Sequence, residues 1–291
     1  MKSIQIAVIA ILAMAVISSC TKEYGYLKPY NSTDSTGTGK TTTPPGGTGG
    51  TADSTYSGTV TNNYQPDSVG SKWTYQVHQV FNFANSTYAQ QDPAAVAIIG
   101  GIVIDTTITY NVQALGTTTP INGLTYQNYS NDYYGGLYAP AVANSNGSYT
   151  GVDLVWEVLW LGGSSFGGFS LNNDTLVYLK EQPSGTTWSE QSVIVDGFGD
   201  SDTSNYTFTI KATGLTKTVN NINYPNVIQV ESKTVPSSIA SYASLFASSG
   251  VDVFTTTEYY YAKNVGLIEE DLSEPFMGVT INATLLSSSI K

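Results

Sequence analysis

Most of the chain after residue 60 alternates between apolar and polar side chains. In residues 102–114, isoleucine, tyrosine, valine and alanine share one face, whereas aspartate, threonine, asparagine and glutamine share the other. Residues 205–212 and 277–285 repeat the same period of two. Because successive side chains of a strand point to opposite faces, this alternation predicts half-buried antiparallel strands.

Turn signals separate the predicted strands. They are Asn122-Gly123, Asn146-Gly147, Asp196-Gly197 and Asn220-Asn221. Such pairs accept the positive φ angles that two-residue hairpins need. The spacing predicts an all-β fold of roughly ten to twelve strands, either an antiparallel curved sheet or a barrel-like meander, with one or two short helices.

Two segments have a helical period instead. Residues 92–99 begin with Asp92 as N-cap and Pro93 at the first helical position. In residues 237–249, apolar side chains recur at helical spacing before Gly250. The second helix is therefore predicted to cap the core or to cover an open face of the sheet.

Two stretches of the folded part are similar to each other. A Gly-x-x-Trp motif opens a strand at Gly70 and Trp73, and again at Gly185 and Trp188. The motif favours two halves of similar design, since two copies are too few for a solenoid.

The N-terminus has the pattern of an export signal. Lys2 precedes an apolar run that ends at Ile17 and is too short for a transmembrane helix. Ile17-Ser18-Ser19-Cys20 follows, and it resembles the lipobox of bacterial lipoproteins. Cys20, the only cysteine, is therefore predicted to be the acylated first residue of the mature protein. An ordinary signal peptide with a chance cysteine is the alternative.

A polar tether is expected next. Residues 31–58 contain only two apolar side chains, so they cannot bury enough surface to offset their ordering entropy. We predict a signal peptide over residues 1–19, a lipidated cysteine and disordered tether over residues 20–60, and a β domain over residues 61–291.

The charge balance excludes nucleic acid as a partner. The formal net charge is −11, there is no arginine, and removal of the signal peptide takes away only Lys2. Nucleic-acid binding needs a basic face, which this composition does not supply. Membrane contact is therefore expected through the N-terminal lipid alone.

No catalytic constellation is evident. His78 is the only histidine, and no Gly-x-Ser-x-Gly elbow accompanies it, so a polar strand residue is the preferred interpretation. Two carboxylates far apart in sequence could still converge as a glycosidase pair. The acidic stretch 269–275 is interpreted as a solvated strand end. We expect a non-enzymatic protein without a cofactor.

One loop is a candidate for calcium. Asp196, Asp200 and Asp202 are its oxygen ligands. The EF-hand register fails, because Lys211 stands where the closing acid belongs. A polar hairpin loop without metal is therefore preferred.

A concavity between the sheet and the second helix is a candidate site for an apolar or amphipathic ligand. Its expected lining is Trp73, Tyr110, Trp188, Phe208, Tyr242 and Phe246. In the competing arrangement these side chains fill the interior, as in small barrels. The 21 tyrosines, against 9 phenylalanines, also suit a glycan or partner surface as well as a half-exposed sheet.

Several short motifs resemble a broad, poorly characterised group of Gram-negative cell-envelope lipoproteins. The group opens with Tyr-x-Pro and Gly-x-x-Trp-x-Tyr, and it closes with Ala-Lys-x-Val-Gly-Leu. The matching residues here are Tyr64, Pro66, Gly70, Trp73, Tyr75, Ala262, Lys263, Val265, Gly266 and Leu267. The resemblance covers most of residues 64–272 and implies an all-β extracytoplasmic domain with no known catalytic residue and no agreed ligand.

Two serines of the tether lie in short motifs of another kind. Asp34-Ser35-Thr36 and Asp53-Ser54-Thr55 resemble an O-glycosylation motif of one Gram-negative phylum, which implies Ser35 and Ser54 as candidate sites. Together these features predict a lipoprotein of the outer membrane, facing the periplasm or the cell surface, with a binding or structural role. Its ligand would be an apolar or amphipathic molecule or a glycan. A hydrolase of envelope glycans or peptides is the alternative.

Overall fold

The computed structural model divides the chain into two compact units, residues 1–53 and residues 54–291. The residues it describes belong to the second unit. They are 54–55, 62–87, 89, 103–131, 141–152, 175–195, 201–236, 246, 248, 250, 252–276 and 278–291. None of the helices in this described part is both long enough and apolar enough to cross a membrane.

The second unit is built from strands, and its described part contains one short 3₁₀ helix, η1 (Phe83–Asn85). The strands are β1 (Ser54–Thr55), β2 (Lys72–Asn82), β3 (Val103–Ile121), β4 (Leu124–Asn131), β5 (Ala141–Ser145), β6 (Ser148–Val152), β7 (Thr175–Lys180), β8 (Thr187–Val195), β9 (Ser201–Val219), β10 (Ile222–Pro236), β11 (Thr255–Ala262), β12 (Gly266–Glu274) and β13 (Val279–Ser289).

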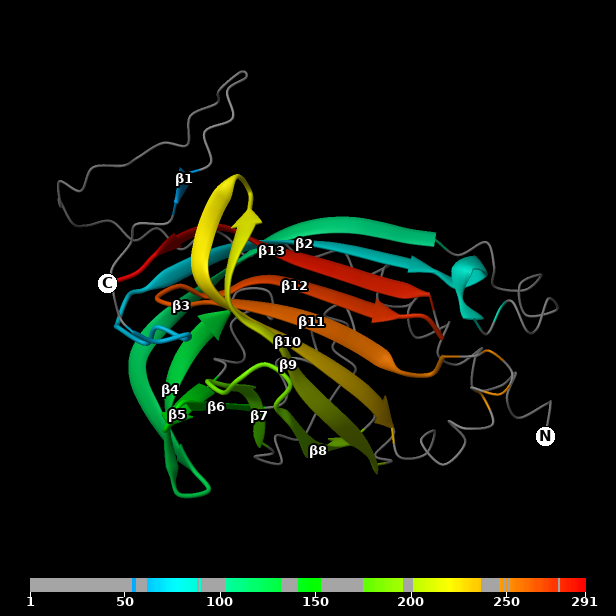
Figure 1. Cartoon of the computed structure of the whole chain (residues 1–291), viewed down its shortest axis with the longest axis horizontal. Helices are drawn as coiled ribbons and strands as arrows, with labels where there is room; N and C mark the ends of the chain where they lie inside the picture. The colour runs from blue at the N-terminus through cyan, green and yellow to red at the C-terminus, as the bar shows by residue number, and fades with distance from the viewer. Residues whose placement is uncertain are drawn as a thin grey trace, which may run out of the picture. The chain divides into compact units, whose positions relative to one another are not determined.

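These strands form one sheet in which most strands pair with their neighbours in the chain. From one edge to the other the order is β7-β6-β5-β4-β3-β2-β13-β12-β11-β10-β9-β8, and every neighbouring pair in this order is antiparallel (Figure 1). The first and last long strands, β2 and β13, therefore pair side by side in the middle of the sheet. The prediction of an all-β antiparallel meander is confirmed.

The predicted alternation of faces is also confirmed. In β9, Tyr206, Phe208 and Ile210 are buried, whereas Thr207 and Lys211 are exposed. Buried side chains of the sheet form two main clusters, one around Trp73 in β2 and one around Trp188 in β8. Each of the two motif tryptophans thus lies in a separate core.

Three of the predicted hairpin turns have the expected backbone. Both central residues have positive φ: 49° and 81° at Asn122-Gly123, 52° and 75° at Asn146-Gly147, and 49° and 63° at Asn220-Asn221. These angles match the type I′ turns that the strand twist favours. The fourth predicted turn, Asp196-Gly197, lies outside the described residues.

The two Gly-x-x-Trp segments have the same local structure. Gly70 and Gly185 have φ angles of 80° and 88°. Each glycine N–H donates to a carbonyl of the next strand, that of Ala114 at 2.9 Å and that of Ile210 at 2.8 Å respectively. The carbonyl of the residue after each glycine accepts a hydrogen bond from the backbone N–H of that same partner residue, at 2.9 Å in both segments. The two segments are therefore structurally equivalent.

The similarity continues in the sequences of the following hairpins, although the strand register differs by two residues, since Trp73 lies opposite Val112 and Trp188 lies opposite Phe208, which aligns with Tyr110. Residues 107–128 and 205–226 align without a gap and share seven identical residues. The shared residues include Gly116 and Gly214, with φ angles of 73° and 68°, and the turn residues Asn122 and Asn220. We infer that strands β2–β7 and β8–β13 are two copies of one six-stranded pattern, which would account for the two Gly-x-x-Trp motifs.

The two ends of the sheet are joined by side chains. β7 and β8 are consecutive in the chain, but the backbone ladder does not join them. The Trp188 indole N–H donates to the Val177 carbonyl at 2.6 Å, and the Glu190 carboxylate accepts from the Val177 N–H. The Lys180 ammonium lies 4.9 Å from the Trp188 ring centroid. We call this junction the seam.

The distal part of the β9–β10 hairpin, residues 215–227, crosses back over the sheet, and we call it the arm (Figure 1). The Lys217 ammonium of the arm donates to Glu269 Oε1 on β12 at 2.7 Å. At the tip, Asn220 Nδ2 donates to the Leu285 carbonyl on β13 at 2.8 Å. The arm is thus held against strands that lie two to four positions away in the sheet.

The start of the folded unit differs from the prediction, and the two predicted helices lie wholly or mostly outside the described residues. β1 pairs in parallel with the start of β10 at Ile222 and Asn223, so the compact unit begins at Ser54 rather than at residue 61. Composition missed this pairing because backbone hydrogen bonds do not require apolar side chains. The helix predicted at 92–99 lies outside the described residues, as does most of the one at 237–249.

Candidate functional site: a polar row across the sheet

Polar side chains form a row across five neighbouring strands. Glu231 of β10 lies opposite Glu258 of β11, which lies opposite Asp271 of β12. Asp271 lies opposite Asn282 of β13, and Asn282 lies opposite His78 of β2. Opposite residues of adjacent strands point to the same face, so these five side chains, which we call the polar row, share one surface. With strands about 4.8 Å apart, the row spans roughly 19 Å.

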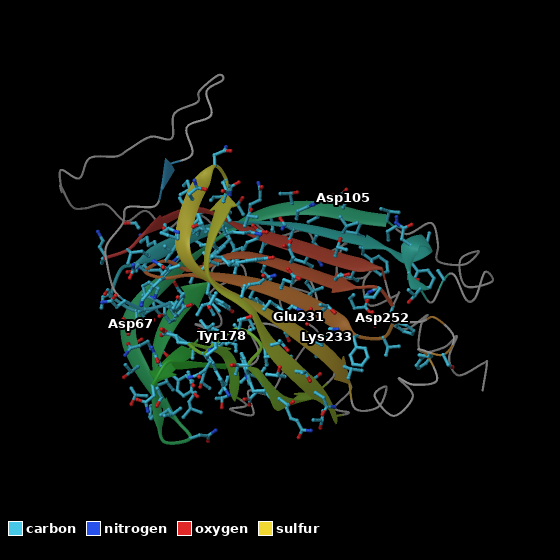
Figure 2. The ribbon with its side chains drawn as sticks, viewed as in Figure 1. Asp67, Asp105, Tyr178, Glu231, Lys233 and Asp252 are labelled. Atoms are coloured by element: carbon cyan, nitrogen blue, oxygen red, sulfur yellow. The ribbon has the colours of Figure 1, made fainter. Side chains whose placement is uncertain are left out.

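The row continues to a sixth strand through a hydrogen bond. His78 Nε2 lies 2.8 Å from Asp105 Oδ1 on β3, and both side chains are at least half exposed. Figure 2 marks the two ends of this arrangement, Glu231 on β10 and Asp105 on β3. His78 is therefore a polar strand residue, as predicted, but one with a defined place in the row.

Side chains next to the row connect its members. Gln229 Nε2 donates to Glu258 Oε2 at 3.0 Å and to the Tyr260 hydroxyl at 3.1 Å. The same hydroxyl donates to Glu258 Oε2 at 2.7 Å. Asn282 Nδ2 donates to Asp271 Oδ1 at 2.5 Å. The carboxylates and amides are thus oriented before any ligand arrives.

The arm supplies a cation to this surface. The Lys217 ammonium, besides its contact with Glu269, lies 3.6 Å from the ring centroid of Tyr260. The Glu269 carboxyl also shares a hydrogen bond with Asp271. Burial raises the pKa of Glu269, whereas the adjacent lysine opposes that rise.

The surface is rich in acid. Glu231, Glu258 and Asp271 lie directly opposite one another, and like charges in that position destabilise a sheet. Among the described residues, ion pairs on this face join Lys211 to Glu231 at 3.4 Å and Lys217 to Glu269. An arrangement that costs stability and is not needed for the fold is a candidate for function.

One acid of β12 points to the opposite face of the sheet from the polar row. Glu270 is 3 % exposed and lies opposite Tyr259 and Ala283 in the core. Burial, together with the nearby Asp271 charge, raises the pKa of Glu270 to about 8. The interpretation of residues 269–275 as a solvated strand end is therefore wrong, because β12 has strands on both sides and alternates its acids between the two faces.

The aromatic residues predicted to line a ligand concavity lie in different places. Trp73 and Tyr110 are buried in the first core cluster, and Trp188 and Phe208 are buried in the second. Phe246 packs against Phe276, with ring centroids 6.0 Å apart. Tyr242 lies outside the described residues. The four described core aromatics have the packed arrangement of a filled interior.

Most of the remaining predicted sites lie outside the described residues. Cys20, Ser35, Asp196 and Asp200 lie outside the described residues, and Asp202 belongs to β9. Ser54 belongs to β1. Within the described part of the chain, no group of three or more histidine, cysteine, aspartate or glutamate side chains could hold a metal ion.

Comparison with known proteins yields two solved structures. One is described as a candidate lipoprotein from Parabacteroides distasonis, 12 % identical, covering 78 % of this chain and 98 % of its own, with a TM-score of 0.39. The other is described as a candidate exported protein with a YmcC-like fold from Bacteroides fragilis, 8 % identical, covering 77 % and 97 %, with a TM-score of 0.35. No protein-family model and no curated protein matches the chain.

Proposed function

We propose that this protein is a lipid-anchored, non-catalytic glycan-binding protein of the bacterial cell envelope. The observation that carries the proposal is the polar row, which places carboxylate, amide and imidazole groups on five adjacent strands of one face. The lipobox at Ile17 to Cys20 supports the anchor, and the outer membrane is the proposed location.

A glycan matches the chemistry of the row. Sugar hydroxyls both donate and accept hydrogen bonds, carboxylates accept them, and amides do both. The length of roughly 19 Å lets consecutive sugar units meet successive strands. An apolar ligand would find few partners on this face, because the apolar side chains of these strands point into the cores.

A binding test follows directly. The full chain, extracted in detergent, is titrated with a panel of envelope-type oligosaccharides, together with the variants Asn282→Ala and Glu258→Gln. Each variant is expected to weaken binding by about tenfold, which corresponds to the loss of one charged or bidentate hydrogen bond of about 1.5 kcal/mol. Gln191→Ala, an exposed side chain on β8 bonded to Asn205 at 2.8 Å, serves as the matched control. The absence of saturable glycan binding would contradict the proposal.

One observation favours a glycan hydrolase as the second candidate. Glu258 and Asp271 lie directly opposite each other, so their Cβ atoms are about 4.5–5.5 Å apart, and a retaining glycosidase also needs two close carboxyl groups. The same titration mixtures are therefore assayed for new reducing ends. Their appearance in the wild type, and their loss in Glu258→Gln with binding retained, would replace the binding function with catalysis.

The anchor has its own test. Changing Cys20→Ala removes the predicted lipid acceptor, so the protein is expected to move from the detergent phase to the aqueous phase. A variant that still partitions as a membrane protein would show that another feature anchors the chain.

A further inference from the structure

We propose that Tyr260, Glu258 and Glu269 form a site for a primary ammonium group, and that Lys217 of the arm occupies this site as an internal competitor. The proposal rests on the glycan-binding function and names the part of the ligand that the site recognises: the free amino group of a hexosamine unit. The arm then controls access to the part of the polar row around Glu258 and Asp271.

The contacts of Lys217 are those of a bound ammonium ligand. Its nitrogen lies 3.6 Å from the Tyr260 ring centroid and 2.7 Å from Glu269 Oε1. A cation over an aromatic face is attracted by the ring quadrupole at distances up to about 6 Å. An adjacent carboxylate adds a charge-assisted hydrogen bond. The surface therefore already holds an ammonium group, in a site that the chain itself fills.

The ring of Tyr260 is held in a position where it can bind a cation. Its hydroxyl donates to Glu258 Oε2 at 2.7 Å, and this bond holds both the ring and the carboxylate in place. Tyr260 is 9 % exposed with the lysine over it, and the Lys217 side chain itself is 25 % exposed. Withdrawal of the lysine would uncover a ring face next to a carboxylate that burial disfavours in its charged form.

The duplication shows that the fold does not require this lysine. In the gap-free alignment of the two hairpins, the position equivalent to Lys217 is Thr119. Thr119 donates to Asn128 Oδ1 of its own hairpin at 3.2 Å, rather than to a distant strand. The first copy thus builds the same hairpin without a cation, so Lys217 is a feature of the second copy alone.

The surroundings favour an amino sugar over other ammonium compounds. Glu269 shares a hydrogen bond with Asp271, which belongs to the polar row and accepts from Asn282. A sugar whose ammonium group lies at Tyr260 would therefore place its ring hydroxyls next to the hydrogen-bonding groups of the polar row. An ethanolamine headgroup or a lysine side chain has the ammonium group but lacks those hydroxyls.

The test compares two probes that differ only at nitrogen. A glucosamine tetramer and its N-acetylated form are titrated by calorimetry into the wild-type full chain and into Lys217→Met. The glucosamine tetramer is expected to bind the variant about tenfold more tightly, because the internal competitor is gone. The acetylated tetramer, which has no cationic nitrogen, is expected to bind both proteins equally. Lys233→Met removes an exposed lysine of β10, two residues from Glu231, and is expected to change neither affinity.

Further variants test the ammonium site even if Lys217→Met loosens the arm from the sheet. Lys217→Arg retains a cation over the ring, so it is expected to behave as the wild type. Tyr260→Leu added to Lys217→Met is expected to abolish the preference for the amino form. Unchanged affinity of both probes in Lys217→Met would overturn the proposal.

The remaining outcomes separate this proposal from the proposed function. If both tetramers bind equally and both lose affinity in Asn282→Ala, the polar row binds glycans and the ammonium site is wrong. If Lys217→Met binds vesicles containing phosphatidylethanolamine and not the tetramer, the ligand is a lipid headgroup and the sugar assignment is wrong. If no glycan binds any variant, the proposed function itself fails.

Discussion

The indole nitrogen of Trp188 lies 2.6 Å from the carbonyl oxygen of Val177 and donates a hydrogen bond across the seam. This bond and the contacts of Glu190 and Lys180, rather than a backbone ladder, connect the two ends of the sheet. The equivalent tryptophan of the first copy, Trp73, donates to the Val265 carbonyl at 2.5 Å. Both tryptophans therefore combine a buried ring with a bond to a strand or turn outside their own hairpin.

The first prediction concerns this bond. Trp188→Phe keeps an aromatic ring in the second core and removes the donor, so the free energy of unfolding is expected to fall by about 1–3 kcal/mol, including the cost of the altered ring. Urea titration followed by tryptophan fluorescence and circular dichroism measures the change. Thr187→Ala, an exposed neighbour, is the control. Equal stability of Trp188→Phe and wild type would show that the seam bond contributes nothing.

The second prediction concerns the buried acid of β12. The pKa of Glu270 is about 8 in the folded state and near its ordinary value of 4.5 in the unfolded chain. Between these values the folded state binds more protons, so the free energy of unfolding falls as the pH rises from about 4.5 to about 8, then levels off. Glu270→Gln is expected to flatten this slope. A wild-type stability that rises steadily over the same interval, with no difference from the variant, would contradict a buried neutral Glu270.

The third prediction concerns two glycines with positive φ. At Gly278, with φ of 74°, a Cβ atom would lie 2.3 Å from the Asn82 carbonyl oxygen. Gly123 has φ of 81°, and no atom lies within 4 Å of its Cβ position. Gly123→Ala is expected to cost about 1 kcal/mol of backbone strain, and Gly278→Ala several times more. Thermal unfolding of both variants provides the comparison, and equal losses would refute the close approach at Gly278.

The fourth prediction uses the two equivalent turns. Asn122 and Asn220 both have φ of 49°, so alanine costs each turn a similar strain. Asn220 also donates to the Leu285 carbonyl at the tip of the arm. Asn220→Ala is therefore expected to lose about 1 kcal/mol more than Asn122→Ala in urea unfolding. The opposite order would mean that the contact at the arm tip is not stabilising.

Alternation along the strands predicted the fold class and the inward faces correctly, because burial on one side of a sheet imposes a period of two on each strand. The Asn-Gly and Asn-Asn pairs located three turns because few residues tolerate their φ angles. The Gly-x-x-Trp motif favoured two halves of similar design, which is also what we infer from the strand order. The longer alignment of residues 107–128 with 205–226 was present in the sequence and would have strengthened that inference.

The candidate site could not be predicted in the same way. Glu231 and Glu258 are the only acids of their strands, and Asp271 is one of four acids in β12. Only the register of four strand pairs brings these three residues together with Asn282 and His78. The contact of Lys217 with Glu269 depends on the arm turning back over the sheet, which no local pattern encodes. One signal in the sequence could have found the row: acids on the same strand face, at the same distance from the turn, in successive hairpins.

The pairing of β2 with β13 also has a consequence for how the chain is connected. The backbone N–H of Lys291 donates to the Ser71 hydroxyl at 3.1 Å, so the last residue lies beside the start of β2. Between Lys180 and Thr187, by contrast, the chain passes through a short turn where the backbone ladder does not join β7 to β8. A circular permutant of residues 71–291 could therefore join Lys291 to Ser71 and open new ends in that turn. Such a permutant would keep every antiparallel pair of the sheet and would present the two copies in reversed order.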